Sequence, residues 1–378
     1  MQSIQTGISM PIGFEVLAQD QDSRARIGRL KTPRGSIETP VFMPVGTAGS
    51  VKAMWPDRLT DLGVRIILAN TYHLYLRPGV EVIEKAGGLH RFMDWPDLLL
   101  TDSGGYQVFS HRGLIKVSEE GVQFTSHLDG SRHFLGPEDS IRVQRTLDAD
   151  IIMAFDECTP YPVTHAEARG SMDLSMRWLT RCLKAAEDRR DRLFGIVQGG
   201  VFPDLRAKSL EQVMAHELPG IALGGFSVGE PRAQMLEMVG RLTEKMPVDR
   251  PRYLMGVGTP LDLVAAVGAG CDMFDCVLPT RNARRGHLFT WHGPVRIKNA
   301  RYRTDFEPVD SRCGCVVCRR FSRAYLRHLF VAGEVLSSIL NTYHNLYFYL
   351  ELMTKVRHRI RVGGLARLQV EIEDAYKR

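Results

Sequence analysis

Short runs of apolar residues recur along the first 280 residues, separated by longer segments with helical periodicity. The runs lack clean alternation of apolar and polar positions, which is typical of parallel strands buried on both faces. They lie at 40–46, 64–71, 97–105, 150–158, 192–200, 220–230, 252–258 and 271–277. Eight such runs alternating with helices predict an α/β fold, the (β/α)8 or TIM barrel, with a doubly wound open sheet as the alternative.

Other segments predict the elements around this barrel. The first forty residues contain "GFEVL", "ARIGRL" and "GSIETP", which predict short antiparallel strands that cap one end of the barrel. Helices are expected at 165–190, 232–246 and 259–270, the last with Thr259 as its N-cap and a proline at its first position.

Polar and small residues follow most of the predicted strands. Catalytic side chains of a (β/α)8 barrel come from the C-terminal ends of its strands, so we expect these residues to converge on one mouth. Asp and Gly are common after any strand, but their agreement at several strand ends favours a site. The candidates are Asp102, Ser103, Tyr106, Asp156, Cys158, Gln198, Gly224, Gly225, Met255, Gly256 and Asp275.

These residue types suit a particular chemistry. Two carboxylates at one mouth can act as nucleophile and general acid/base, as in glycoside chemistry. A third carboxylate, an amide and glycine backbone can bind a planar ligand rich in N–H groups, such as guanine, between Tyr106 and Met255. The spacing does not distinguish guanine from another planar amide. Neither GxGxxG nor a Walker pattern occurs, so a nucleotide cofactor is not expected.

Charge is concentrated in one part of the chain. The 378 residues carry a net charge of +6, yet residues 281–330 hold 12 Lys and Arg against 3 Asp and Glu. Arg281, Arg284 and Arg285 come directly after the last predicted strand, which favours a surface that binds phosphates beside the site. A solvated basic face is the alternative.

Hydropathy indicates the compartment. With 44% hydrophobic and 24% charged residues, the composition is ordinary for a globular protein. No run of about 18 apolar residues occurs, so no membrane span is expected. The opening "MQSIQTGISMPIG" lacks the basic and apolar regions of a signal peptide, and the predicted location is the cytoplasm.

Three closely spaced cysteines predict a metal site. In a reducing compartment the motif "CGCVVC", with Cys313, Cys315 and Cys318, indicates metal ligation more than disulfides. A closed tetrahedral zinc site needs a fourth ligand, for which we choose His344, with His328 as the alternative. One structural Zn²⁺ would stabilise a segment without a large core.

The predicted regions are a barrel with N-terminal strands at 1–280, a basic zinc-binding helical subdomain packed on the barrel at 281–360, and a C-terminal segment returning to the barrel at 361–378.

Seven motifs, in order, resemble those of one family. They are "LLLTDSGGYQVFS", "DIIMAFDEC", "FGIVQGG", "ALGGFSVGE", "YLMGVGTP", "MFDCVLPTRNARRG" and "CGCVVC" with a later His. They span nearly the whole chain and resemble the queuine tRNA-ribosyltransferases, also called tRNA-guanine transglycosylases. The resemblance implies a (β/α)8 barrel enzyme with a zinc subdomain, a pentosyltransferase of queuosine biosynthesis. Such an enzyme would replace guanine at the wobble position (34) of tRNAs with GUN anticodons by a 7-deazaguanine base.

The resemblance also implies roles for the candidate residues. Asp275 would be the nucleophile that attacks the ribose C1′ and forms a covalent enzyme–RNA intermediate, and Asp102 would be the general acid/base. The other strand-end candidates would bind the base, the three arginines would bind RNA, and the zinc ligands would be Cys313, Cys315, Cys318 and His344.

Details within the family concern the base and the partners. Cys158 and Val228 resemble the bacterial type, which uses the precursor preQ1 and forms homodimers; its tRNAs would be those for aspartate, asparagine, histidine and tyrosine. Two positions depart from the pattern: Phe226 stands where leucine is common, and Arg285 where asparagine is frequent.

Three other functions compete with this interpretation. The first is a non-catalytic RNA-binding relative, against which the presence of both Asp102 and Asp275 argues. The second is an archaeal-type exchanger, which usually carries further C-terminal RNA-binding domains. The third is a barrel glycosidase for free nucleosides, for which the basic stretch would have no purpose.

Overall fold

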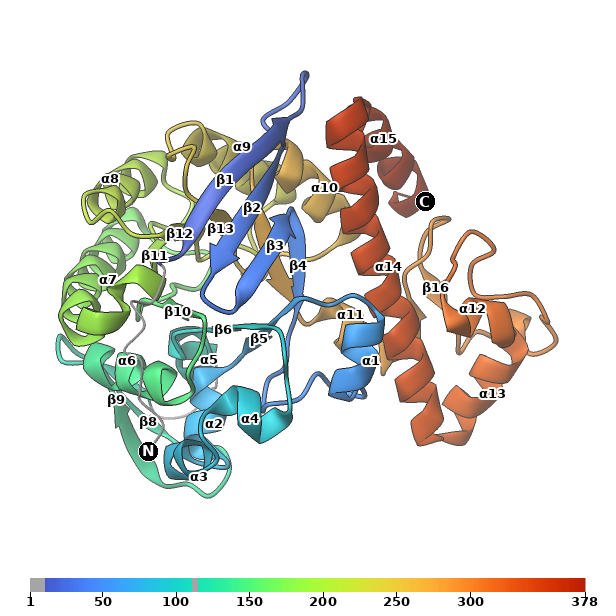
Figure 1. Ribbon diagram of the computed structural model, residues 1–378, viewed down its shortest axis with the longest axis horizontal. Coiled ribbons are helices and arrows are strands. Elements are labelled where there is room, and N and C mark those ends of the chain that lie inside the picture. Colours follow the sequence, from blue (N-terminus) through green and yellow to red (C-terminus); the bar gives the residue numbers. More distant parts are fainter. Residues whose placement is uncertain (1–10, 111–114, 378) are drawn as a thin grey trace, which may run out of the picture.

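A barrel of parallel strands lies at the centre of the computed structural model, which describes residues 11–110 and 115–377 (Figure 1). Each strand lies inside one of the eight predicted apolar runs. The strands are β4 (Val41–Pro44), β5 (Ile66–Ala69), β6 (Leu98–Thr101), β10 (Ile151–Met153), β11 (Leu193–Val197), β12 (Gly220–Leu223), β13 (Arg252–Leu254) and β14 (Met273–Cys276).

The eight strands close on themselves. They pair in parallel in the order β4-β14-β13-β12-β11-β10-β6-β5, and a parallel bridge between Val45 and Leu68 links the two ends of this order. An open doubly wound sheet would leave two unpaired edges. The predicted (β/α)8 barrel is therefore confirmed over its alternative.

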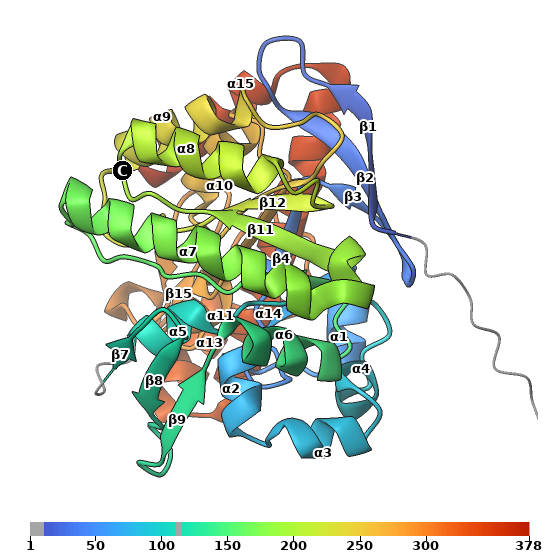
Figure 2. The same ribbon diagram turned by 90° about the vertical axis from the view of Figure 1, so that its left-hand side faces the viewer.

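Helices cover the outside of the barrel (Figure 2). The helix after β13 begins as predicted, because the Thr259 side-chain oxygen accepts the N–H of Asp262 at 3.1 Å and Pro260 occupies the first turn. The helices up to the last strand are α1 (Pro56–Asp61), α2 (Thr71–Leu76), α3 (Val80–Lys85), α4 (Leu89–Met93), α5 (Gly105–Ser110), α6 (Pro137–Thr146), α7 (His165–Ala186), η1 (Glu187–Arg192), α8 (Pro203–Met214), α9 (Arg232–Thr243) and α10 (Pro260–Gly268).

The predicted N-terminal cap is present. Strands β1 (Gly13–Gln19), β2 (Arg26–Thr32) and β3 (Gly35–Thr39) form an antiparallel sheet that leads directly into the start of β4. Buried Leu30 and Ile37 belong to the same core as the barrel-interior residues Ile66 and Phe194. The sheet therefore covers the end of the barrel where its strands begin, and leaves the other end for chemistry.

A second small sheet was not predicted. Strands β7 (Lys116–Val117), β8 (Val122–Thr125) and β9 (Arg132–Leu135) form it between β6 and β10. The Tyr72 and Tyr75 hydroxyls of α2 each lie 3.0 Å from a ring nitrogen of this insertion, in His127 and His133 respectively.

Beyond β14 the chain forms a mainly helical region. Its elements are α11 (Leu278–Ala283), β15 (His287–Leu288), β16 (Val295–Arg296), η2 (Ala300–Tyr302), α12 (Val316–Arg320), α13 (Arg323–Ala332), α14 (Val335–Val362) and α15 (Leu365–Tyr376). The long helix α14 starts beside α13 and packs along the barrel against β4, and α15 packs against α10 (Figure 1). The boundaries after residues 280 and 360, which separate the barrel, the zinc-binding subdomain and the C-terminal segment, stay predictions.

None of the helices in the described ranges is both long enough and apolar enough to span a membrane.

Candidate active site

One pocket lies at the C-terminal ends of the barrel strands. It has a volume of about 420 Å³ and brings together residues from nearly all strand ends. The predicted residues that line it are Asp102, Ser103, Tyr106, Asp156, Cys158, Gln198, Gly224, Gly225, Met255, Gly256, Asp275 and Arg281. All eleven strand-end candidates therefore share one cavity, and their individual roles stay predictions.

Asp275 is held by one of its two carboxylate oxygens. Oδ1 accepts the hydroxyl of Tyr253 at 2.6 Å and the backbone N–H of Gly256 at 2.8 Å. Oδ2 accepts no hydrogen bond from the described residues. Burial raises the pKa of this carboxyl, and the two donors lower it in part. This arrangement fixes the carboxylate and leaves one oxygen available to a substrate.

Asp102 lies at the end of β6 in a ring of donors. Oδ1 accepts the backbone N–H of Thr71 at 2.8 Å, and Oδ2 accepts the side-chain amides of Asn70 and of Gln107, the latter at 2.7 Å. Burial raises the pKa of Asp102 to about 6, a rise that the charge of Asp275 increases and these donors oppose. A carboxyl with a pKa this close to neutrality can both donate and accept a proton.

Asp156 and Gln198 form a hydrogen-bonded pair in the wall of the pocket. Gln198 Nε2 donates to Asp156 Oδ2 at 2.7 Å, and Ser103 Oγ donates to Oδ1 at 3.1 Å. Burial raises the pKa of Asp156 to about 6. The neighbouring Cys158 thiol is neutral, because burial raises its pKa to about 12. Carboxylate and amide together present acceptors and donors to a planar ligand.

Two glycines follow β12 because larger residues would not fit. A Cβ at Gly224 would lie 2.7 Å from Gln198 Nε2, and Gly225 has a φ of +67°, a conformation that favours glycine. The backbone of these glycines therefore reaches the pocket directly.

The three predicted RNA-binding arginines lie on or just after α11. Arg281 is exposed and lines the pocket, whereas Arg284 and Arg285 lie outside it. Arg284 Nη1 donates to the carbonyl of Thr280 at 2.8 Å, and Arg285 is exposed. The cations thus extend from the mouth of the pocket across the adjoining surface.

Three polar side chains that line the pocket and bond to its acids were missed from the sequence: Asn70, Gln107 and Tyr253. Asn70 follows β5 as the acids follow other strands, and that signal could have identified it. Gln107 lies in the motif that contains Asp102, but its contact arises only through the turn into α5. Tyr253 lies within β13, where an aromatic residue is ordinary, and only the fold directs its hydroxyl to Asp275.

Cys313, Cys315, Cys318 and His344 form a buried cluster whose ligand atoms all lie within 4.8 Å of one another. The Sγ atoms lie 3.8, 3.6 and 3.3 Å from His344 Nδ1. Tetrahedral zinc would separate such atoms by about 3.6 Å, given its usual bond lengths. His344 Nε2 lies 2.8 Å from the carbonyl of Phe289, which orients Nδ1 towards the thiols. The predicted Cys₃His structural metal site is confirmed with His344, and the alternative His328 is not part of it.

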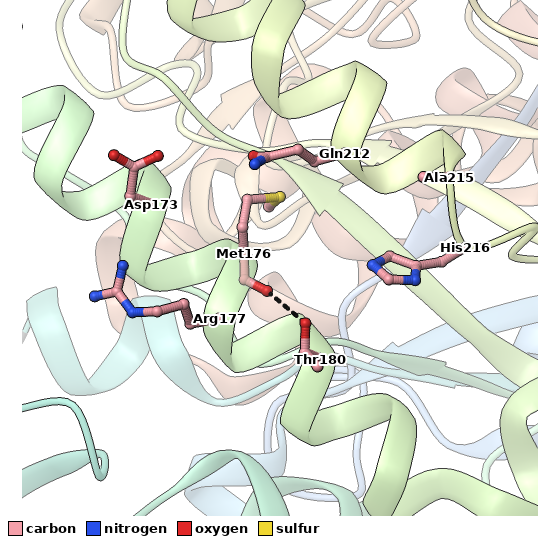
Figure 3. Close-up of a pocket in the computed structure, with 7 residues that line it drawn as sticks. All are labelled: Asp173, Met176, Arg177, Thr180, Gln212, Ala215 and His216. Atoms are coloured by element: carbon pink, nitrogen blue, oxygen red, sulfur yellow. Dashed lines mark hydrogen bonds between the residues drawn. The ribbon is translucent and has the colours of Figure 1, made fainter.

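Another hollow lies on the outer surface between α7 and α8 (Figure 3). Its charged residues Asp173 and Arg177 are bonded to Lys208 and Glu119, at 2.8 Å each. It lies on the helices and not at the strand ends, so it adds no candidate for catalysis.

A closed parallel barrel with two buried acids and one partly buried acid at its mouth, and a Cys₃His cluster beyond its last strand, defines a barrel enzyme with a structural metal site. The profile of the family described as queuine tRNA-ribosyltransferase matches residues 20–378. The chain belongs to this family, which confirms the resemblance and the predicted enzyme class, a pentosyltransferase of the tRNA-guanine transglycosylase type.

Individual relatives agree with this assignment. Proteins named queuine tRNA-ribosyltransferase are similar over almost their full length. That of Caldanaerobacter subterraneus subsp. tengcongensis is 53% identical over 97% of this chain and 98% of its own. The protein of Solidesulfovibrio magneticus is 56% identical over 94% and 96%, and that of Pseudomonas putida 55% over 94% and 95%.

Proposed function

We propose that this enzyme replaces guanine at the wobble position (34) of GUN-anticodon tRNAs by the free base preQ1. The observation that carries the proposal is the joint placement of Asp275, Asp102 and Asp156 in one pocket beside exposed arginines. The substrate base must leave the RNA stack to reach these acids.

The first half of the reaction forms a covalent intermediate. Asp275 Oδ2 attacks the ribose C1′ as the bond from C1′ to guanine N9 breaks, and Asp102 gives a proton to the departing base. Tyr253 and Gly256 hold Oδ1, so the attacking oxygen is already oriented.

The second half reverses these steps with a different base. Asp102 removes a proton from the incoming base, whose N9 attacks C1′ and releases Asp275. Two displacements at one carbon retain the anomeric configuration, as in retaining glycosidases. The intermediate preserves the energy of the glycosidic bond, so the exchange needs no ATP.

Base recognition falls to the wall formed by Asp156 and Gln198. Ionised Asp156 accepts N1–H and the exocyclic amine of guanine, and a backbone N–H of the Gly224–Gly225 turn donates to O6. Tyr106 and Met255 stack on the two faces of the ring. Cys158 and Val228 line the pocket and support preQ1 as the incoming base.

This recognition predicts a dependence on pH. Because the pKa of Asp156 is raised to about 6, acidification below that value protonates the acceptor. The KM for guanine should then rise about tenfold per pH unit below pH 6, and stay level above pH 7. The KM for guanine at each pH is measured from steady-state guanine exchange at saturating tRNA. In Asp156→Asn the KM should already be high at pH 7.5 and change little with pH; a wild-type KM that is constant from pH 5 to 7.5 contradicts the assignment.

RNA binding predicts a dependence on salt. Arg281 and Arg285 are exposed beside the pocket, where they can contact phosphates. Replacing both by Gln should raise the KM for tRNA, with kcat nearly unchanged, and should reduce the slope of log affinity against log salt by about 0.7–0.9 per lost contact. Arg65→Gln is the control, because Arg65 is exposed at the opposite end of the barrel and paired with Asp97. An equal effect of the double variant and of Arg65→Gln on the KM for tRNA would refute the proposed RNA contacts of Arg281 and Arg285.

The assembly and partners are part of the proposal. Exposed apolar residues gather on and near α13 and the start of α14: Phe306, Tyr325, Val331, Val335 and Leu336. Such a patch supports a homodimer, which sedimentation velocity tests against the monomer mass of 42.5 kDa. We propose the tRNAs for aspartate, asparagine, histidine and tyrosine as substrates, and the cytoplasm as the location.

Exchange itself is the test of the proposed function. Labelled guanine should enter a GUN-anticodon tRNA and then be displaced by unlabelled preQ1. A tRNA in which guanosine 34 is replaced by adenosine is the control. Failure of guanine to enter the matched tRNA would refute the proposed activity.

A further inference from the structure

Arg206 of α8 is fully buried directly behind the base pocket. Its guanidinium donates to four carbonyls: Nε to Gly200 at 2.7 Å, Nη1 to Val197 at 2.8 Å and to Gly224 at 2.7 Å, and Nη2 to Gly225 at 3.4 Å. The Phe226 ring lies 4.0 Å from its Cζ atom. Among the described residues it forms no ion pair with a carboxylate.

Burying a charged guanidinium without a carboxylate partner costs free energy, so a role for Arg206 is expected. Burial lowers the pKa of Arg206 to about 9, which still leaves it charged at neutral pH. Buried arginines usually pair with a carboxylate. Here all the acceptors are backbone carbonyls at the ends of β11 and β12, the two strands that supply Gln198 and the glycine turn. Arg206 thus ties together two strand ends of the pocket.

The hydrogen bond from Arg206 to the Gly224 carbonyl fixes the direction of the next N–H, that of Gly225. In a trans peptide the C=O and the following N–H point in opposite directions. The carbonyl of Gly224 points to Arg206, so the N–H of Gly225 points away from Arg206. Gly224 and Gly225 line the pocket and Arg206 does not. Within the described residues this N–H donates to no acceptor.

We propose that Arg206 is a positioning residue that holds the Gly224–Gly225 peptide with its N–H directed at the O6 of the bound base. The inference rests on the proposed function, because it assigns a partner to a group of that base. Arg206 acts through the peptide and does not touch the substrate. The surrounding glycines cannot fix this orientation alone, since they lack side chains.

The test compares Arg206→Lys with Arg252→Lys in the full-length enzyme. Arg252 is a matched control: it is also buried and donates to the carbonyls of Gly270 and Met246, but lies at the start of β13, away from the pocket. For Arg206→Lys we expect the KM for guanine to rise about tenfold or more, because the bound base loses one hydrogen bond. We expect a KM for tRNA within about threefold of wild type. Arg252→Lys should lower the thermal midpoint without changing the KM for guanine.

Two outcomes would overturn the proposal: an unchanged KM for guanine in folded Arg206→Lys, or equal effects in both variants, which indicate a general structural role. A second measurement needs no variant. Guanine added to wild-type enzyme should slow amide hydrogen exchange at Gly225, and unchanged exchange on saturation also refutes the inference. Absence of guanine exchange by the wild type refutes instead the proposed function, so the two failures are distinguishable.

Discussion

Asp275→Asn should abolish the covalent adduct between enzyme and tRNA and reduce base exchange by about 10⁴-fold or more. An amide cannot supply the anionic oxygen that bonds to C1′, although it has nearly the same shape. Denaturing gels of enzyme mixed with labelled tRNA measure the adduct, and guanine incorporation measures the rate. Binding of tRNA should persist, because the arginines beside the pocket are unchanged.

A graded control accompanies this variant. Tyr253→Phe removes the hydroxyl that bonds to Asp275 Oδ1 at 2.6 Å but keeps the carboxylate. The adduct should still form, about 10- to 100-fold more slowly, because orientation is lost and the nucleophile is not. An adduct that persists at full yield in Asp275→Asn would assign the nucleophile elsewhere, with Asp102 as the first candidate.

Removal of zinc should unfold the region around the Cys₃His cluster and abolish exchange. The three cysteines belong to a small separate core that includes Leu288, Val295, Ile297, Tyr302, Val309, Val317 and Leu326. Structural zinc in small modules contributes on the order of 10 kcal/mol, more than a core of this size supplies. Hydrogen exchange should therefore accelerate in peptides from residues 287–332 after chelation, while barrel peptides keep their protection.

Two cysteine variants separate zinc loss from general damage. Cys318→Ser removes a ligand and should lower the bound zinc from one ion per chain. Cys271→Ala removes a buried thiol outside the cluster and should retain the full zinc content. Unchanged hydrogen exchange in the metal-free protein would show that the cluster does not stabilise this region.

The barrel could be predicted from the sequence because its strands are buried on both faces and leave continuous apolar runs. The insertion β7–β9 could not. Lys116–Val117 is too short for a pattern, and in Arg132–Leu135 the sequence does not reveal the buried face, because the apolar Phe134 is exposed and only Leu135 is buried. Its placement depends on contacts with α2, which are distant in sequence.

The acids of the site were predictable for a related reason. Asp102 and Asp156 follow buried strands and Asp275 lies near the end of one, so barrel topology alone places them together. Tyr253 and Arg206 were not identified, because their contacts depend on where β13 and α8 lie in the folded chain. His344 was chosen over His328 without a decisive signal, and the folding of α14 beside α12 settles the choice.

The most direct test of the central claim is mass spectrometry of the trapped intermediate. Enzyme and a GUN-anticodon RNA are mixed without free base, quenched in denaturant and digested with protease and nuclease. The remaining ribonucleotide should be attached to the peptide that contains Asp275, at that carboxylate. Attachment at another residue, or no attached nucleotide while exchange proceeds, would contradict the account.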